Sequence, residues 1–250
     1  MQPSLEKRPE TMRGVWLTGH GGFEHLEIHD DIPTPQFGPD EVLIQVRAAA
    51  VNNTDINVRT AWYSKQAGSG EDASWGGTPM PFPLVQGADV CGHIVAVGEK
   101  VSATRIGERV LVEPCLWQVN GKALEQPGYL GSECDGGFAE YTVVASRYAH
   151  KVDSRYSDTD LASFPCSYST AENLLTRANV GQGDRLLVTG ASGGVGSAVV
   201  QLAKVRGAEV IAITSAAKAA AMLDLGATTT LARGESILKE LGKNSVDVVV

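Results

Sequence analysis

The sequence has few of the features that define several large classes of protein. It contains no run of about 18 or more apolar residues, and residues 1–10 lack the apolar core of a secretory signal. Lys and Arg number 21 against 29 Asp and Glu, the formal net charge is -8, and there is no basic run. We therefore expect a cytoplasmic protein whose partner is a small-molecule substrate, not nucleic acid or a membrane.

Cysteine is also scarce. The four cysteines are far apart in the chain and form no C-x-x-C pair: Cys91, Cys115, Cys134 and Cys166. This spacing favours neither a disulfide framework nor a ribbon-type zinc site. We expect reduced thiols.

The first part of the chain consists of short β-type runs separated by Gly and Pro. These runs predict a compact, largely antiparallel, barrel-like domain over residues 1–155. Among them, residues 64–80 are poor in aliphatic side chains and rich in Gly and Ser. We interpret that segment as an exposed loop, with a lid as the alternative role. The runs are Glu41 to Arg47, Cys91 to Val97, Arg109 to Glu113 and Ala139 to Val144.

The second part, residues 156–250, has a different pattern. A helical stretch contains Asp160 to Ala178, and apolar strands then alternate with helical segments. This alternation predicts an α/β domain with a doubly wound parallel sheet. The predicted strands are Arg185 to Val188, Glu209 to Ile213, one near Thr228 to Leu231, and Val246 to Val250.

The most informative segment is Leu186 to Gly196, LLVTGASGGVG, in which an apolar strand leads into a Gly-rich turn that opens a helix. Backbone amides and the positive helix end then face a pyrophosphate, which predicts a dinucleotide site. The alternative is a tight strand-to-helix turn that needs small residues and holds no ligand. The predicted cofactor-binding residues of this turn are Ala191, Ser192, Gly193, Gly194, Val195 and Gly196.

The end of the second strand predicts which cofactor binds. An acid at this point, about 20 residues after the glycines, hydrogen-bonds the ribose of NAD. Here Ser215 occupies that point in AITSAAK, and no acid is near. Ser215 and Lys218 are able to donate to a 2′-phosphate, so we expect NADPH. Lys218 is alternatively a solvated helix lysine.

The motifs together resemble the medium-chain dehydrogenase/reductase superfamily. They are PFPLVQGADVCGHIVAVGEKV, GERVLVEP, DGGFAEYTVV and VTGASGGVGSAVVQLAK, in the family's order. The resemblance implies a GroES-like catalytic domain, a Rossmann domain and a nicotinamide cofactor. It also places Thr170 near the nicotinamide, although Ser169 and Thr170 are residue types that cap helices as well.

The resemblance also bears on zinc. At the positions of the first two ligands of the zinc alcohol dehydrogenases, this sequence has Asn52 and Ala88, whereas Cys166 matches the third ligand and Asp89 the adjacent acid. Zinc normally takes three protein ligands, with thiolate and imidazole as usual donors. We therefore expect no metal site. The resemblance is then to the zinc-independent quinone oxidoreductases and enoyl reductases.

For that branch we expect hydride transfer to a quinone or to the β-carbon of a conjugated enone, with the oxyanion met by hydrogen-bond donors. The candidates are the Asn52 amide and the Tyr63 hydroxyl, with Thr54 as a proton relay and Asp55 as an anchor. Asn52 alternatively shapes a turn, and Tyr63 alternatively packs as an aromatic. Two other functions stay open: an alcohol dehydrogenase with a metal site rebuilt on Cys166 and Asp89, and a non-catalytic NADPH-binding protein.

The last predicted strand lies at Val248 to Val250, the fourth of a sheet that usually has six. An apolar strand without its neighbour is an aggregation liability. We therefore expect the sequence to be a truncated portion of a longer chain. The resemblance implies that this longer chain is a homodimer.

Overall fold

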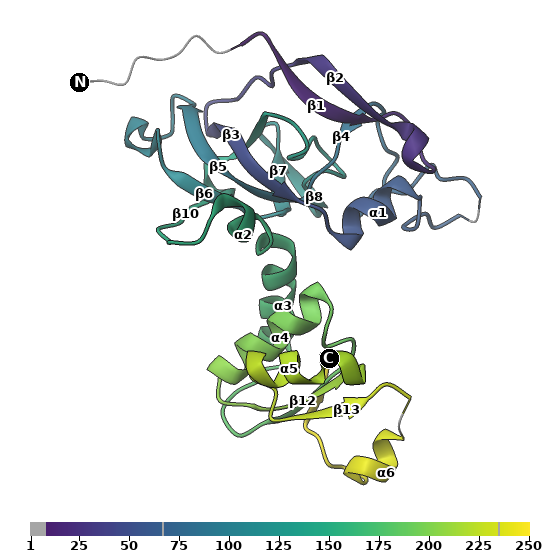
Figure 1. The fold of residues 1–250 in the computed structure, drawn as a ribbon. Coiled ribbons are helices and arrows are strands. Elements are labelled where there is room, and N and C mark those ends of the chain that lie inside the picture. Colours follow the sequence, from purple (N-terminus) through teal and green to yellow (C-terminus); the bar gives the residue numbers. More distant parts are fainter. Residues whose placement is uncertain (1–8, 67, 235) are drawn as a thin grey trace. The chain divides into compact units, whose positions relative to one another are not determined.

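The computed structural model describes residues 9–66, 68–234 and 236–250. The chain divides into two compact units, unit 1 ending at Pro165 and unit 2 beginning at Cys166 (Figure 1). The sequence analysis set the boundary earlier, between residues 155 and 156. The helix after that point belongs to unit 1 because its Leu161 and Ala162 side chains are buried in one cluster with Cys91.

Unit 1 is built from antiparallel strands. A five-stranded sheet has the order β10-β6-β5-β3-β9, a three-stranded sheet has the order β2-β1-β4, and β7 and β8 form a separate hairpin. The strands are β1 (Thr11–Leu17), β2 (Leu26–Pro33), β3 (Glu41–Ala50), β4 (Leu84–Val85), β5 (Asp89–Val97), β6 (Arg109–Val112), β7 (Cys115–Val119), β8 (Lys122–Tyr129), β9 (Tyr141–Ala145) and β10 (Ala149–Lys151).

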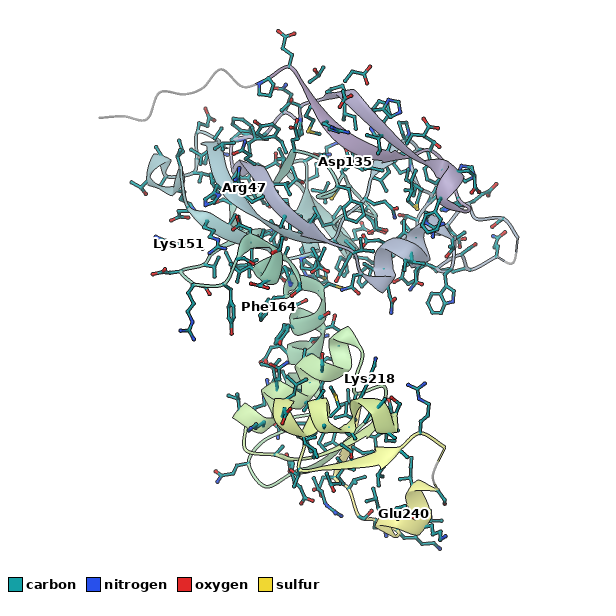
Figure 2. All side chains as sticks on the ribbon, in the orientation of Figure 1. Arg47, Asp135, Lys151, Phe164, Lys218 and Glu240 are labelled. Atoms are coloured by element: carbon teal, nitrogen blue, oxygen red, sulfur yellow. The ribbon has the colours of Figure 1, made fainter. Side chains whose placement is uncertain are left out.

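The core of unit 1 forms where these strands direct aliphatic side chains inward. Alternate residues of a strand point to opposite faces, and Val42 and Ile44 of β3 meet Val90 and Ile94 of β5 in one buried cluster. A bridge between Gly14 and Ala139 connects the three-stranded sheet to the segment that enters β9. Figure 2 shows side chains filling the space among the strands.

Short helices complete unit 1. They are α1 (Asn53–Arg59), α2 (Asp158–Ala162) and the 3-10 turns η1 (Phe23–His25), η2 (Ala103–Arg105) and η3 (Ser146–Tyr148). None of the helices in the described ranges combines the length and apolar character needed to span a bilayer.

The segment 64–80 is a loop, but the interpretation of it as exposed is wrong for residues 73–77. Ala73 and Ser74 are buried. The backbone amides of Trp75 and Gly76 donate to the side chains of Ser132 and Glu133, both at 2.7 Å. The Gly-rich composition hides this because the partners lie far away in sequence. Residue 67 lies outside the described residues.

Unit 2 contains the predicted parallel sheet, with strand order β13-β12-β11-β14. Together with the antiparallel unit 1, this sheet confirms the predicted fold class. Its strands are β11 (Arg185–Val188), β12 (Glu209–Thr214), β13 (Thr229–Ala232) and β14 (Val248–Val249); its helices are α3 (Pro165–Arg177), α4 (Gly194–Val205), α5 (Ala219–Leu225), α6 (Ile237–Leu241) and the 3-10 turn η4 (Ala216–Lys218).

The helical stretch predicted around Asp160 to Ala178 is two helices. Helix α2 ends at Ala162 and α3 begins at Pro165. A proline cannot donate to the preceding turn, and it disfavours helical backbone in the residue before it, so a continuous helix breaks there.

Candidate functional site

The N-terminus of α1 holds the first group of candidate residues. Asn52 is the N-cap, and its Oδ1 accepts from the Asn53 amide at 2.8 Å. In return, the Asp55 carboxylate accepts from the Asn52 amide at 2.8 Å. The Asn52 side chain also accepts from the Asp55 backbone amide, and this reciprocal pair is a capping box, which fixes the chain at the entry to the helix.

The side-chain amide of Asn52 is oriented by a buried carboxylate. Its Nδ2 donates to Asp89 Oδ2 at 3.0 Å, and Asp89 is only 1% exposed at the start of β5. A carboxylate oxygen accepts hydrogen bonds, whereas the amide nitrogen donates them. The bond therefore fixes which end of the amide is the nitrogen.

Asp55 anchors α1 to the chain segment before β5. Its Oδ1 accepts from the Gly87 and Ala88 amides at 3.2 and 3.3 Å, and its carbonyl oxygen accepts from Gln86 Nε2 at 2.9 Å. Burial, with a smaller contribution from Asp89, raises the pKa of Asp55 to about 6 against the lowering effect of these amides. The expected role of Asp55 as an anchor agrees with these contacts.

Thr54 and Tyr63 lie together. The Tyr63 hydroxyl donates to Thr54 Oγ1 at 3.3 Å and accepts from Asn57 Nδ2, also at 3.3 Å. Sequence analysis missed Asn57. Its position three residues after Thr54 on a helix was the available signal, because residues at that spacing are neighbours on one helix face.

At the zinc-ligand positions of the zinc alcohol dehydrogenases, Asn52 and Ala88 offer neither a thiolate nor an imidazole. In the described part of the chain, no group of three or more His, Cys, Asp or Glu is placed to hold an ion. Ala88 adds only a buried methyl group, and Asn52 adds an amide already bonded to Asp89. Zinc independence stays a prediction.

In unit 2, the predicted glycine turn connects β11 to α4. Gly190 has φ +55°, Gly193 is the N-cap of α4, and a Cβ on Gly196 would lie 2.4 Å from the Gly190 carbonyl oxygen. Gly196 thus permits the tight turn itself. The first amides of the helix have no carbonyl partner within it and, with the helix dipole, favour an anion there.

The end of the second strand borders a hollow of about 280 Å³, lined by residues after β12 and on β13. Thr214 is 1% exposed, and its Oγ1 has no hydrogen-bond partner among the described residues. Ser215 also lines the hollow, whereas Lys218 is exposed beside it and is not part of the lining. An unpartnered hydroxyl in a hollow at this strand end fits the ribose side of a dinucleotide.

Thr170 does not cap a helix, so that alternative is wrong. It lies inside α3, and its Oγ1 donates to the Cys166 carbonyl oxygen at 2.7 Å, one turn earlier. Its predicted place near the nicotinamide stays a prediction.

Comparison with known proteins identifies both parts of the chain. Residues 38–154 match the alcohol dehydrogenase GroES-like domain, and residues 186–250 match the NAD dependent epimerase/dehydratase family. The chain is 33% identical to an acryloyl-coenzyme A reductase of Metallosphaera sedula, over 96% of this chain and 69% of that protein. It is 29% identical to a human quinone oxidoreductase, over 96% of this chain and 65% of that protein.

A solved structure gives the same result. A protein assigned as an alcohol dehydrogenase, from Sinorhizobium meliloti, is 44% identical and has a TM-score of 0.87, with 98% of this chain and 70% of that chain covered. The fold and these relatives define an oxidoreductase with a nicotinamide cofactor. The chain belongs to the medium-chain dehydrogenase/reductase superfamily, which confirms the resemblance.

Proposed function

We propose that the protein is an NADPH-dependent oxidoreductase that transfers hydride to a quinone or an α,β-unsaturated carbonyl without catalytic zinc. An acryloyl thioester and a quinone, the compounds named in two relatives, both carry a C=C bond conjugated with C=O. Hydride addition to either one places negative charge on a carbonyl oxygen. The protein must therefore supply donors to that oxygen.

The hydrogen bond from Asn52 to Asp89 carries this proposal. It holds an amide, a hydrogen-bond donor and a poor zinc ligand, where the zinc enzymes of the superfamily have a thiolate. The charge that a metal ion would stabilise then falls to hydrogen-bond donors of α1 and the segment after it.

The direction of the hydrogen bonds supports the proposed catalytic roles. Tyr63 accepts from Asn57 and donates its own proton to Thr54. In this proposal the Thr54 hydroxyl donates its proton to the substrate oxygen, and Tyr63 polarises the Thr54 hydroxyl. Asn52 is the second donor. The cofactor, when bound, supplies the hydride.

The hollow at the end of β12 supports NADPH over NADH. None of the described residues that line it has a carboxylate, and Ser215 contributes a hydroxyl. A 2′-phosphate there meets no like charge. Lys218 follows Ser215 by three residues, in the adjacent 3-10 turn, and supplies the opposite charge in this proposal.

The cofactor preference is tested by substitution. We expect Lys218→Ala to weaken NADPH binding about tenfold, the effect of one charge-assisted hydrogen bond, and to leave NADH binding unchanged. Lys239→Ala, an exposed lysine of α6, is the matched control. Equal losses for both cofactors, measured by fluorescence titration, would contradict the assignment.

The activity is tested by following NADPH absorbance with a simple quinone and with an acyclic enone, with and without a chelator. We expect turnover that the chelator does not change. Activity lost with chelator and restored by zinc would indicate an alcohol dehydrogenase with altered ligands. A rise in melting temperature with NADPH but no reduction of any quinone, enone or aldehyde would indicate a non-catalytic binding protein.

A further inference from the structure

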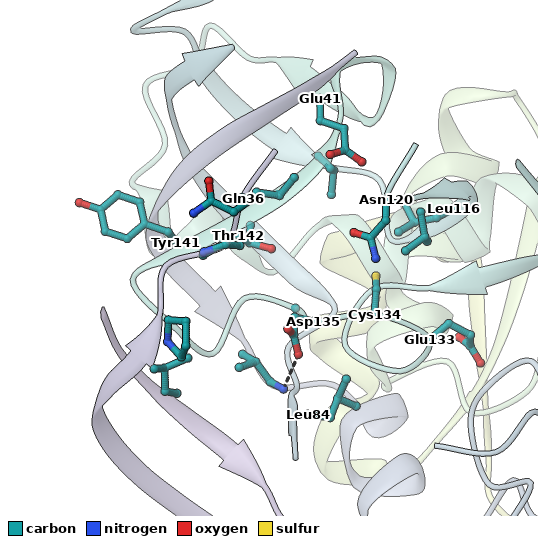
Figure 3. A pocket seen from close by; sticks show the side chains of 18 of the residues that line it. Gln36, Glu41, Leu84, Leu116, Asn120, Glu133, Cys134, Asp135, Tyr141 and Thr142 are labelled. Carbon is teal, nitrogen blue, oxygen red and sulfur yellow. Dashed lines mark hydrogen bonds between the residues drawn. The ribbon is translucent and has the colours of Figure 1, made fainter. Parts of the chain in front are cut away.

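A cavity of about 320 Å³ lies within unit 1, and none of the residues proposed for catalysis lines it (Figure 3). Its walls come from β1, β2, the start of β3, β4, β7, β9 and the turn at residues 133–136. An apolar cavity of about 150 Å³ is large enough to hold benzene. This cavity therefore has room for one aromatic ring with a short polar chain. Met12, Ile32, Leu84 and Leu116 supply apolar wall.

The lining carries negative charge only. Three carboxylates line the cavity, from Glu41, Glu133 and Asp135, and no Lys, Arg or His is found among the described lining residues. The Cys134 thiol adds no charge, since burial raises its pKa to about 12. A cavity with this lining favours a cationic ligand.

Two of the carboxylates are already satisfied by the backbone. One Glu41 oxygen accepts from the Gly38 amide at 2.7 Å and the other from the Gly121 amide at 3.0 Å. The Glu133 oxygens accept in the same way, from the amides of Gly76 and Tyr129, each at 2.7 Å. Glu41 and Glu133 therefore shape the wall of the cavity and contribute negative electrostatic potential to it.

Asp135 differs from them. Its Oδ1 accepts from the Val85 amide at 2.9 Å, and Oδ2 makes no hydrogen bond within the described ranges. The side chain is accessible, yet the surrounding protein raises the pKa of its carboxyl through burial. Asp135 therefore lies at the solvent-accessible side of the cavity, with Oδ2 open to a ligand.

Thr142 of β9 is the independent sign of a ligand. It is 2% exposed, and its Oγ1 has no hydrogen-bond partner in the part of the chain that the structure describes. Figure 3 shows its side chain directed into the space between Asn120 and Asp135. Buried hydroxyl groups nearly always have a partner, so this one is available to a polar group of a ligand in the cavity.

We propose that this cavity binds a small primary ammonium ion with an apolar, ring-sized body. The ammonium group donates to Asp135 Oδ2 and to Thr142 Oγ1, and the body packs against the aliphatic wall. A bare metal ion is the poorer occupant, because the described residues offer no group of three ligating side chains. The site does not depend on the proposed reductase activity.

The experiment is calorimetric titration of the protein with 2-phenylethylammonium chloride, 2-phenylethanol and 3-phenylpropionate. These probes share the ring and differ in the charge of the head. We expect the ammonium to bind about tenfold or more tightly than the alcohol, and the carboxylate not to bind. Equal binding of ammonium and alcohol would overturn the proposal, as would no binding of the ammonium.

Substitutions of lining residues test whether the ligand binds in the cavity. Asp135→Asn keeps an acceptor for the Val85 amide and should remove the preference for the ammonium, whereas Asp153→Asn, an exposed control, should keep it. Thr142→Val removes an unpartnered hydroxyl, so it should fold at least as stably as the wild type and bind the ammonium several-fold more weakly. Full ammonium affinity in both Asp135→Asn and Thr142→Val would place the ligand elsewhere and refute the site.

Discussion

The direction of the pKa shift of Asp55 can be tested, because opposing effects act on this one buried carboxyl. Burial and the nearby charge of Asp89 favour its protonated form, whereas the amides of Asn52, Gly87 and Ala88 favour the carboxylate. Burial dominates and raises the pKa from 3.8 to about 6. The opposite result, a lowered pKa, is what the amide hydrogen bonds alone would produce.

The magnitude follows from linkage. The folded state binds the Asp55 proton more tightly than the unfolded chain, so between the two pKa values it holds more protons. The free energy of unfolding must therefore fall as pH rises from 3.8 to about 6. A shift of about 2 units at ~1.4 kcal/mol each gives a loss of about 3 kcal/mol, complete above the folded pKa.

The measurement compares the wild type with Asp55→Asn, which has no carboxyl to titrate at this position. Urea unfolding of both proteins from about pH 3.5 to about pH 7.5 gives a difference in unfolding free energy at each pH. We expect this difference to move by about 3 kcal/mol in favour of the variant as pH rises. Asp153→Asn, an exposed site, reports the effect of net charge.

We also expect a constant difference in unfolding free energy between wild type and Asp55→Asn, because the asparagine NH₂ faces one donor amide of the capping box. That offset does not vary with pH and leaves the slope intact. A flat difference, or one that moves in favour of the wild type as pH rises, would refute the dominance of burial. A carboxyl ¹³C titration of Asp55 provides the direct check, with an expected midpoint at about 6.

Three further predictions follow from single contacts. Tyr63→Phe removes the hydroxyl that bonds Thr54 and should lower kcat about tenfold to a hundredfold with KM little changed, in NADPH oxidation assays; an unchanged kcat would remove Tyr63 from the site. Gly196→Ala puts a Cβ 2.4 Å from the Gly190 carbonyl oxygen and should abolish cofactor binding and lower the melting temperature, and normal NADPH affinity would contradict the turn geometry. Cys134, with its raised pKa, should resist iodoacetamide at about pH 8 until the protein unfolds, as measured by mass spectrometry.

The sequence predicted unit 2 well and the periphery of unit 1 poorly, for physical reasons. Strand β11 was predicted with its observed bounds, since a short apolar run between loop residues can be buried only in a central strand. Strands β1 and β2 were missed. They pair mainly with each other, and β2 carries acids and His29 along LEIHDDIP, so its apolar and polar residues do not alternate cleanly.

The candidate site shows the same contrast between local and distant contacts. Thr54 and Tyr63 are nine residues apart, and a helix and turn bring them together. Asp89, which orients Asn52, lies 37 residues further along the chain, and spacing alone gives no reason to pair the two. The resemblance had put both at matching family positions without predicting a hydrogen bond between them.

A short segment connects the two polar sites of unit 1. The Val85 amide donates to Asp135 in the cavity. The amides of Gly87 and Ala88, two and three residues later, donate to Asp55 at the base of α1. Both carboxyls have raised pKa values because of burial. Protonating either one weakens a bond that holds this segment in place. Asp89, which orients the Asn52 amide, directly follows this segment, so the amide depends on a segment that two acids hold. A substitution at either acid must therefore be judged by a structural measurement as well as by turnover.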